Sequence, residues 1–205
     1  GAEIAAGWAG SLTMGAGQFC TNPGIAIGID GPDLDSFVST ARDALRAVEA
    51  QTMLTDGIAD AYRAGRARIA DVPGVTEVFG STCEGRQASP FLYETDAQTW
   101  LAQHGLAEEV FGPLGLIVRL QDADQMSAIA QTLQGQLTCT LHLDPEDNPM
   151  ARSLLPILER KAGRVLANGF PTGVEVADSM VHGGPYPAST NFGATSVGTL
   201  AIRRF

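Results

Sequence analysis

Residues 24–32 read Gly24-Ile25-Ala26-Ile27-Gly28-Ile29-Asp30-Gly31-Pro32, an apolar run that stops at three turn-forming residues. The isoleucines alternate with small residues, which is the pattern of a β-strand. Beyond the turn, apolar side chains recur at helical spacing, at Phe37, Val38, Ala41, Leu45 and Val48. The carboxylate of Asp33 or Asp35 can accept hydrogen bonds from the first free backbone N–H groups. We therefore predict a helix from residue 33 to about residue 50.

Strand and helix patterns continue to alternate along the chain. Further helices are predicted over residues 58–70, 123–133 and 150–161, and further strands over 75–79, 91–94, 116–120, 137–143 and 164–168. The connections are long enough for crossovers, which favours parallel strands. We predict an α/β fold with a mostly parallel sheet flanked by helices, and one domain over residues 1–205. In such sheets ligands bind beyond the carboxyl ends of the strands, where we expect the site.

Composition narrows the class of protein. The 205 residues include 13 Lys and Arg against 23 Asp and Glu, a formal net charge of −10, which disfavours binding to nucleic acid or to an anionic membrane. The three cysteines have no C-x-x-C spacing, which is typical of a reduced, cytoplasmic protein. We also expect no membrane span and no secretory leader, since long apolar runs and a basic N-terminal region are missing.

A glycine-rich segment, residues 15–24, places Cys20 immediately before the first strand. Its order differs from the dinucleotide fingerprint, in which a strand precedes G-x-G-x-x-G and a helix follows. A free thiol is partly ionised at neutral pH and reactive, so Cys20 is a candidate nucleophile. The alternative is a buried cysteine that acts as a small apolar side chain. Cys83, in a polar loop, and Cys139, in a strand pattern, are weaker candidates.

The three histidines are widely separated in the sequence. His182 lies in a Gly/Pro-rich stretch and could pair with Cys20 in a thiol hydrolase or acyltransferase. His142 alternates within a strand pattern and is interpreted as structural, and His104 follows a predicted helix end. Because no metal-ligand spacing is present, no metal site is predicted.

Two more segments contain candidate residues. Residues 108–113 read Glu-Glu-Val-Phe-Gly-Pro, where the carboxylates either bind ribose hydroxyls or are simply solvated. Residues 168–187 combine aromatic residues with glycine and proline, including Phe170 and His182, and form either pocket walls or a subunit contact.

The combination resembles the aldehyde dehydrogenase superfamily. The resemblance rests on residues 17–20 (Gly-Gln-Phe-Cys), 109–113 (Glu-Val-Phe-Gly-Pro), 168–170 (Asn-Gly-Phe) and 183–184 (Gly-Gly), in that order. The longer runs over 17–24, 168–176 and 181–187 are similar to the branch that acts on α-ketoglutaric semialdehyde (2,5-dioxovalerate).

The resemblance implies a catalytic domain that oxidises a small carboxylated semialdehyde with NAD or NADP. Cys20 would attack the aldehyde and pass through a thiohemiacetal and a thioester. Glu109 and Phe111 match cofactor-binding positions. The residues that match substrate-binding positions or flank the nucleophile are Thr21, Asn22, Phe170 and His182.

Several parts of the family pattern are not found in these 205 residues. They are the Glu-x-Gly-Gly general base, the upstream asparagine that binds the oxyanion, the nucleotide-binding domain and the C-terminal oligomerisation strand. We therefore expect this chain alone to be inactive, whereas a longer parent protein would be an active homo-oligomer. A non-catalytic scaffold on the same fold remains a further alternative.

Overall fold

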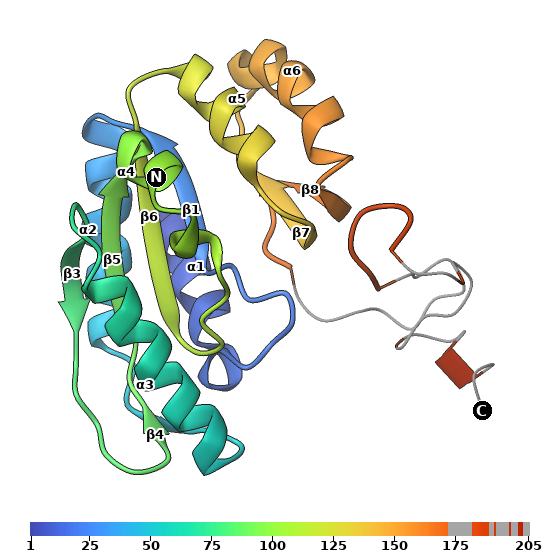
Figure 1. The fold of residues 1–205 in the computed structure, drawn as a ribbon. Helices are drawn as coiled ribbons and strands as arrows, with labels where there is room; N and C mark the ends of the chain where they lie inside the picture. Colours follow the sequence, from blue (N-terminus) through green and yellow to red (C-terminus); the bar gives the residue numbers. More distant parts are fainter. Residues whose placement is uncertain (172–181, 189–190, 192–196, 198–200, 203–205) are drawn as a thin grey trace. The chain divides into compact units, whose positions relative to one another are not determined.

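The computed structural model describes residues 1–171, 182–188, 191, 197 and 201–202 (Figure 1). The chain divides into two compact units, Gly1–Ile129 and Ala130–Phe205. In the described part of the chain, no helix has both the length and the apolar character needed to cross a membrane.

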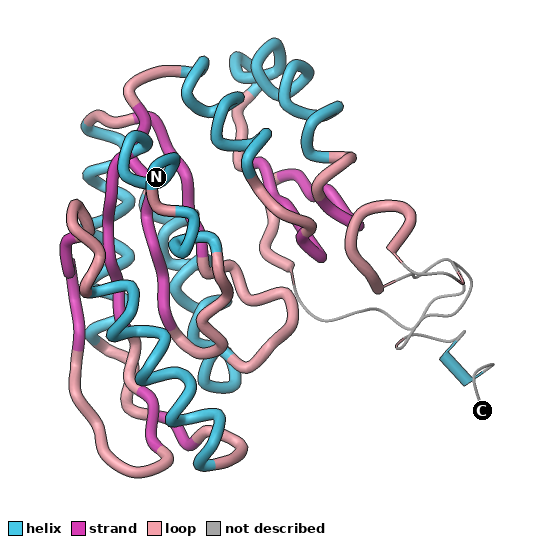
Figure 2. Tube along the Cα trace, viewed as in Figure 1, coloured by secondary structure: helices cyan, strands magenta, loops and turns pink. Residues whose placement is uncertain are grey.

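The first unit contains a four-stranded sheet in the order β1-β6-β5-β3 (Figure 2). Its strands are β1 (Ile25–Ile29), β3 (Thr76–Gly80), β5 (Phe91–Asp96) and β6 (Leu114–Leu120). β6 runs parallel to both β1 and β5, whereas β3 runs antiparallel to β5. The mostly parallel sheet flanked by helices is thus confirmed. Six of the seven residues of β6 are buried, which explains its nearly continuous apolar sequence.

Four helices accompany this sheet: α1 (Ala2–Thr13), α2 (Pro32–Arg46), α3 (Asp56–Ala70) and α4 (Ala97–Ala102). A short pair of antiparallel strands, β2 (Gln51–Thr52) and β4 (Gln87–Ala88), lies outside it. The rings of Trp8 on α1 and Phe37 on α2 pack with centroids 5.6 Å apart. The Trp8 ring lies directly over Gly115 of β6, where a Cβ would come within 2.3 Å of it.

Helix α1 is absent from the sequence prediction. Its buried residues, Ala5, Trp8, Ala9 and Leu12, follow the three- and four-residue spacing of a helix face. The sequence therefore carries a local signal for this helix. Helix α1 is part of the core, since Ala5 and Leu12 are fully buried.

The beginning of α2 differs from the prediction. The helix starts at Pro32 behind Gly31, and neither Asp33 nor Asp35 forms a side-chain cap. Asp35 instead accepts a hydrogen bond from Arg119 of β6 at 2.9 Å. Arg119 also donates to Asp30 and Glu94, at 2.6 and 3.0 Å. Burial lowers the pKa of Arg119, but the three carboxylates outweigh burial and raise it overall. The capping prediction was wrong for both residues, and for Asp35 the reason is that the guanidinium of Arg119, on a distant strand, attracts its carboxylate.

The second unit contains the parallel pair β7 (Gln136–Leu141) and β8 (Ala162–Ala167) and the helix α6 (Asn148–Leu158), while α5 (Ala123–Thr132) spans the division. All four elements were predicted with slightly different ends. Most of the Gly/Pro-rich stretch after residue 171 lies outside the described residues.

Candidate active site

The segment before Cys20 makes an unusual left-handed turn. Gly15, Ala16 and Gly17 have φ values of 56°, 58° and 67°. Left-handed backbone costs an L-residue with a side chain about 1–2 kcal/mol, so Ala16 needs support from its surroundings. Gly17 has a second constraint, since a Cβ there would lie 2.3 Å from the carbonyl carbon of Gly112. The turn therefore places the backbone of Gly17 directly against residues 112–113.

Two glutamine side chains hold this turn. Gln51 Oε1 accepts a hydrogen bond from Ala16 N at 2.8 Å, and Gln51 Nε2 donates to Thr13 O at 3.1 Å. Gln18 Nε2 donates to Gly15 O at 2.9 Å, and Gln18 Oε1 accepts from Leu54 N at 2.9 Å. Residues 51–54 thus hold residues 13–18 in place with hydrogen bonds in which each segment both donates and accepts. The contribution of Gln51 could not be predicted, because its partner Ala16 is 35 residues away in sequence.

Cys20 lies on a short turn between this segment and β1. Asn22 N donates to Phe19 O at 3.0 Å, which closes the turn around Cys20 and Thr21. The Asn22 side chain donates to Leu12 O at the end of α1, at 2.7 Å. Cys20 is exposed, whereas Thr21 is only 4% exposed. The substrate-binding roles of Thr21 and Asn22 stay predictions, and the structure gives Asn22 a part in holding the loop.

Helix α3 supports the segment that carries Glu109 and Phe111. Arg68 donates to Gly105 O at 3.0 Å and forms an ion pair with Glu108. At Gly65 of the same helix, a Cβ would come within 2.9 Å of Val110. Glu109 is exposed and Phe111 is half-buried, so the carboxylate and part of the ring are accessible to a ligand. Arg68 was not singled out by the sequence analysis, because its partners lie 37 and 40 residues away in sequence.

The structure brings the cysteine segment and the 109–113 segment together. They meet where Gly17 contacts Gly112, and they lead into β1 and β6, which are adjacent parallel strands. Both segments precede their strands, so these candidate residues lie at the amino ends of β1 and β6. We expected the site at the carboxyl ends of the strands, and this placement differs. The usual rule describes loops that follow strands, whereas Cys20 and Glu109 lie on loops that enter them.

Phe170 and His182 belong to the second unit, so the structure gives no geometry between them and Cys20. The Phe170 ring packs on the His142 ring, with centroids 4.7 Å apart. Burial lowers the pKa of His142, and burial together with the Arg164 charge lowers the pKa of His182. The pairing of Cys20 with His182 stays a prediction, as do the roles of Phe170 and His182.

The other two cysteines have different surroundings. The Cys83 thiol donates to Gln87 O at 3.0 Å, and burial raises the pKa of the Cys139 thiol on β7. Cys20 is exposed, whereas Cys83 and Cys139 are half-buried. Within the described ranges, no group of three or more His, Cys, Asp or Glu side chains could hold a metal ion.

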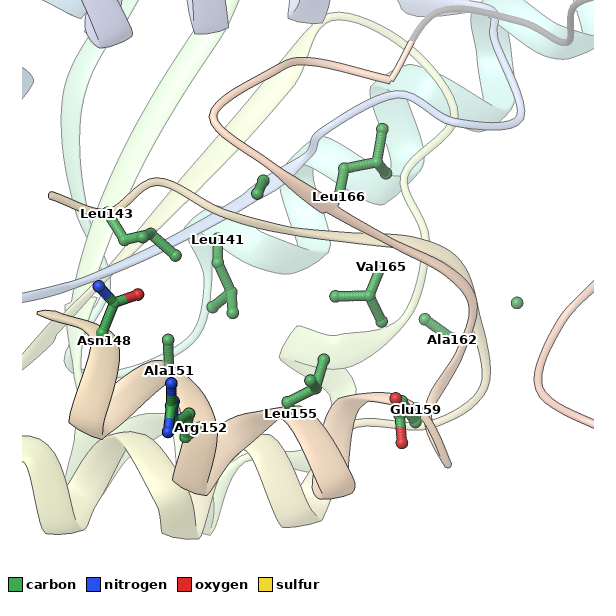
Figure 3. Close-up of a pocket in the computed structure, with 12 residues that line it drawn as sticks. Leu141, Leu143, Asn148, Ala151, Arg152, Leu155, Glu159, Ala162, Val165 and Leu166 are labelled. Carbon is green, nitrogen blue, oxygen red and sulfur yellow. The ribbon is translucent and has the colours of Figure 1, made fainter. Parts of the chain in front are cut away.

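A groove of about 540 Å³ lies in the second unit between α6 and the β7–β8 pair (Figure 3). Its walls are mainly apolar, including Leu141, Leu155 and Val165, and Arg152 and Glu159 also line it. The described residues that line it include no thiol and no imidazole, so this groove differs in character from the segments around Cys20.

We expect His142 to make the second unit sensitive to acid. Its Nε2 is buried and has no hydrogen-bond partner among the described residues, and its lowered pKa favours the neutral form in the folded state. In the unfolded chain histidine binds a proton near its ordinary pKa of about 6.5. Stability is therefore complete above that pH and is lost as the pH falls through the lowered pKa of the folded state. We expect the free energy of unfolding of the second unit to decrease from pH 7 to pH 5.

The measurement is urea unfolding of the chain at several pH values, in which hydrogen exchange of β7 and β8 reports the unfolding of the second unit. His142→Phe should make the pH dependence less steep and leave only the part due to His182, whose pKa is also lowered. His104→Phe on the surface of the first unit should leave it unchanged. An equally steep pH dependence in His142→Phe would assign the effect to another group.

Comparisons with known proteins identify homologues along the whole chain. It is 55% identical over 207 residues to an α-ketoglutaric semialdehyde dehydrogenase 2 of Azospirillum brasilense, and 42% identical over 212 residues to an α-ketoglutaric semialdehyde dehydrogenase of Acinetobacter baylyi. Each match covers 100% of this chain but only 39% and 40% of the relatives. The chain thus spans about two fifths of their length. No family model matches the sequence.

Solved structures with the same fold include aldehyde dehydrogenases. Aldehyde dehydrogenase 21 from Physcomitrella patens, in complex with succinate, superposes with a TM-score of 0.73 at 16% identity, over 89% of this chain and 38% of that one. An NADP-dependent glyceraldehyde-3-phosphate dehydrogenase from Bacillus halodurans gives 0.72 at 19% identity, over 89% and 38% of the two chains. Over its whole length the chain is therefore homologous to part of the α-ketoglutaric semialdehyde dehydrogenases, and it has the fold of the matching part of aldehyde dehydrogenases.

Proposed function

We propose that these 205 residues carry the cysteine nucleophile and part of the cofactor site of an NAD(P)-dependent aldehyde dehydrogenase. Its substrate would be a small carboxylated semialdehyde, α-ketoglutaric semialdehyde, and its product 2-oxoglutarate. The observation that carries the proposal is the exposed Cys20, which follows a hydrogen-bonded turn whose Gly17 packs against Gly112 of the 109–113 segment. The 55% identity to a protein named for this substrate supports the choice of aldehyde.

In the proposed reaction the Cys20 thiolate adds to the aldehyde carbon and forms a thiohemiacetal. Loss of a hydride from that carbon leaves a thioester on Cys20. Water then adds to the thioester, and the carboxylate and the free thiol are released with a proton. The backbone N–H of Cys20 is one donor to the oxyanion. The Glu-x-Gly-Gly base that the resemblance implies is not found in these 205 residues.

The residues at the amino ends of β1 and β6 fit a nicotinamide cofactor. The exposed Glu109 carboxylate can accept hydrogen bonds from ribose hydroxyls, and the accessible part of the Phe111 ring can pack against the nicotinamide. When bound, NAD or NADP supplies the hydride acceptor. The ion pair of Arg68 with Glu108, together with the packing of Val110 on Gly65, holds the backbone on which Glu109 and Phe111 lie.

Thr21, Asn22, Phe170 and His182 are proposed as the substrate side of the site. A polar residue such as His182 suits a substrate with a carboxylate better than a larger, apolar aromatic ring would. We also propose that the whole protein is a homo-oligomer. It would have no nucleic-acid or membrane partner, in keeping with the net charge of −10 of these 205 residues.

The test uses a chimera in which this chain replaces the matching portion of the Azospirillum brasilense relative, 39% of its length. Nicotinamide reduction is measured with α-ketoglutaric semialdehyde, succinic semialdehyde and propanal, each with NAD and with NADP. We expect kcat/KM to be highest for α-ketoglutaric semialdehyde, and the 205-residue chain alone to show no turnover. A well-folded chimera that oxidises none of the aldehydes would overturn the proposal.

A further inference from the structure

The left-handed turn at residues 15–17 is bonded by one side chain, Gln51, at Ala16 within the turn and at Thr13 just before it. Ala16 is 1% exposed, and its N–H points to Gln51 Oε1 at 2.8 Å. Thr13 O, at the end of α1, accepts from Gln51 Nε2 at 3.1 Å. One amide group therefore bonds both sides of the turn, as donor on one side and acceptor on the other.

The turn is directly connected to the nucleophile segment. Gln18, two residues before Cys20, donates to Gly15 O and accepts from Leu54 N, so it bonds the same turn and the segment that carries Gln51. Beyond Cys20, Asn22 is bonded to Leu12 O. Cys20 is only four residues after Ala16, and hydrogen bonds fix the backbone at Gly15 and the side chains of Gln18 and Asn22. A change of backbone conformation at Ala16 would therefore shift Cys20.

We propose that Gln51 is a positioning residue for Cys20: its amide keeps Gly15–Gly17 left-handed and so sets the orientation of the exposed thiol. The expected effect of Gln51 on kcat rests on the proposed function. The claim that Gln51 holds the turn before Cys20 does not depend on that function. Misplacing a reacting group by about 1 Å can lower a rate by about 10²-fold.

The test compares Gln51→Met, which removes both hydrogen bonds, with Gln87→Met on the neighbouring strand. Gln87 is a matched control: in the β2–β4 pair it is opposite Thr52, the residue after Gln51, and its side chain donates to Thr52 Oγ1 at 2.9 Å rather than to the turn. Gln51→Glu is the conservative variant, because a carboxylate still accepts from Ala16 N but cannot donate to Thr13 O.

The first readout is amide hydrogen exchange in the 205-residue chain. Gln51→Met should speed exchange of residues 16–22 by about tenfold or more, while β1 and β6 stay as protected as before. Gln87→Met should change neither. Faster exchange throughout the first unit would overturn the inference, since it would show a general loss of stability. Unchanged exchange of residues 16–22 would overturn it as well.

The second readout is the steady-state kinetics of the chimera. Gln51→Met should lower kcat by about tenfold or more, while KM for the nicotinamide cofactor stays within about twofold of that of the unaltered chimera. The kcat of Gln51→Glu should lie between those of Gln51→Met and the unaltered chimera. Unchanged kcat in Gln51→Met would overturn the positioning role even if exchange increased. If the unaltered chimera oxidises no aldehyde, the proposed function fails, and the exchange result alone decides for or against the inference.

Discussion

Replacing Cys20 with alanine is expected to lower kcat/KM of the chimera for α-ketoglutaric semialdehyde by about 10³-fold or more. The reaction needs a covalent bond between sulfur and the aldehyde carbon, and no other exposed thiol lies in the described part of the chain. Alanine removes that bond and leaves the backbone N–H of residue 20 in place. The variant should therefore still fold and still bind the cofactor.

Cys83→Ala is the matched control for this prediction. Cys83 is partly buried, and its thiol already donates to Gln87 O at 3.0 Å. We expect kcat/KM of Cys83→Ala to stay within about threefold of the unaltered chimera. Full activity of Cys20→Ala would remove Cys20 from the mechanism.

Cys20→Ala and a further variant, His182→Ala, separate the competing reactions. A thiol hydrolase or acyltransferase would turn over thioesters or esters without any nicotinamide and would lose that activity in His182→Ala. Ester turnover that needs Cys20 and His182, together with no aldehyde oxidation, would favour that alternative. A non-catalytic scaffold would show neither activity, with or without Cys20.

The second large effect is expected from Gly17→Ala. At a φ of 67°, alanine adopts a backbone conformation that costs about 1–2 kcal/mol. Its Cβ would also lie 2.3 and 2.4 Å from the carbonyl carbon and oxygen of Gly112. These are backbone atoms at the entrance to a buried strand, so they cannot move aside as a flexible side chain would. We expect the free energy of unfolding of the first unit to fall by about 3 kcal/mol or more.

Gly85→Ala separates the two contributions. Gly85 has a similar φ of 59°, but a Cβ there would meet no atom within 4 Å. It should therefore cost only the conformational part, about 1–2 kcal/mol. Both variants can be measured by urea unfolding followed by tryptophan fluorescence, because Trp8 and Trp100 are buried in the first unit, at 3% and 4% exposure. Equal losses in the two variants would contradict the contact between Gly17 and Gly112.

The order of the strands and helices could be predicted because it depends on neighbours along the chain. Alternating isoleucines mark β1, and apolar side chains at helical spacing mark α2 and α3. Helix α1 carries the same kind of signal. The residue types of the candidate site were also visible locally, as a cysteine in a glycine-rich loop and a carboxylate near an aromatic residue.

The arrangement of the candidate site depends on residues far apart in sequence. No local pattern predicts that Ala16 is left-handed, since alanine alone avoids that conformation and adopts it here with Gln51 bonded to its N–H. Other contacts also join residues that are far apart in sequence. They are the contact of Gly17 with Gly112, the hydrogen bonds from α3 to residues 105–110, and the hydrogen bond from Arg119 to Asp35. The sequence by itself determined the elements and the chemical groups, because hydrophobic periodicity and turn formation act over a few residues. Only the tertiary structure decided that Cys20 and Glu109 lie at the amino ends of neighbouring strands, because strand pairing and close backbone contacts join segments that are about 90 residues apart.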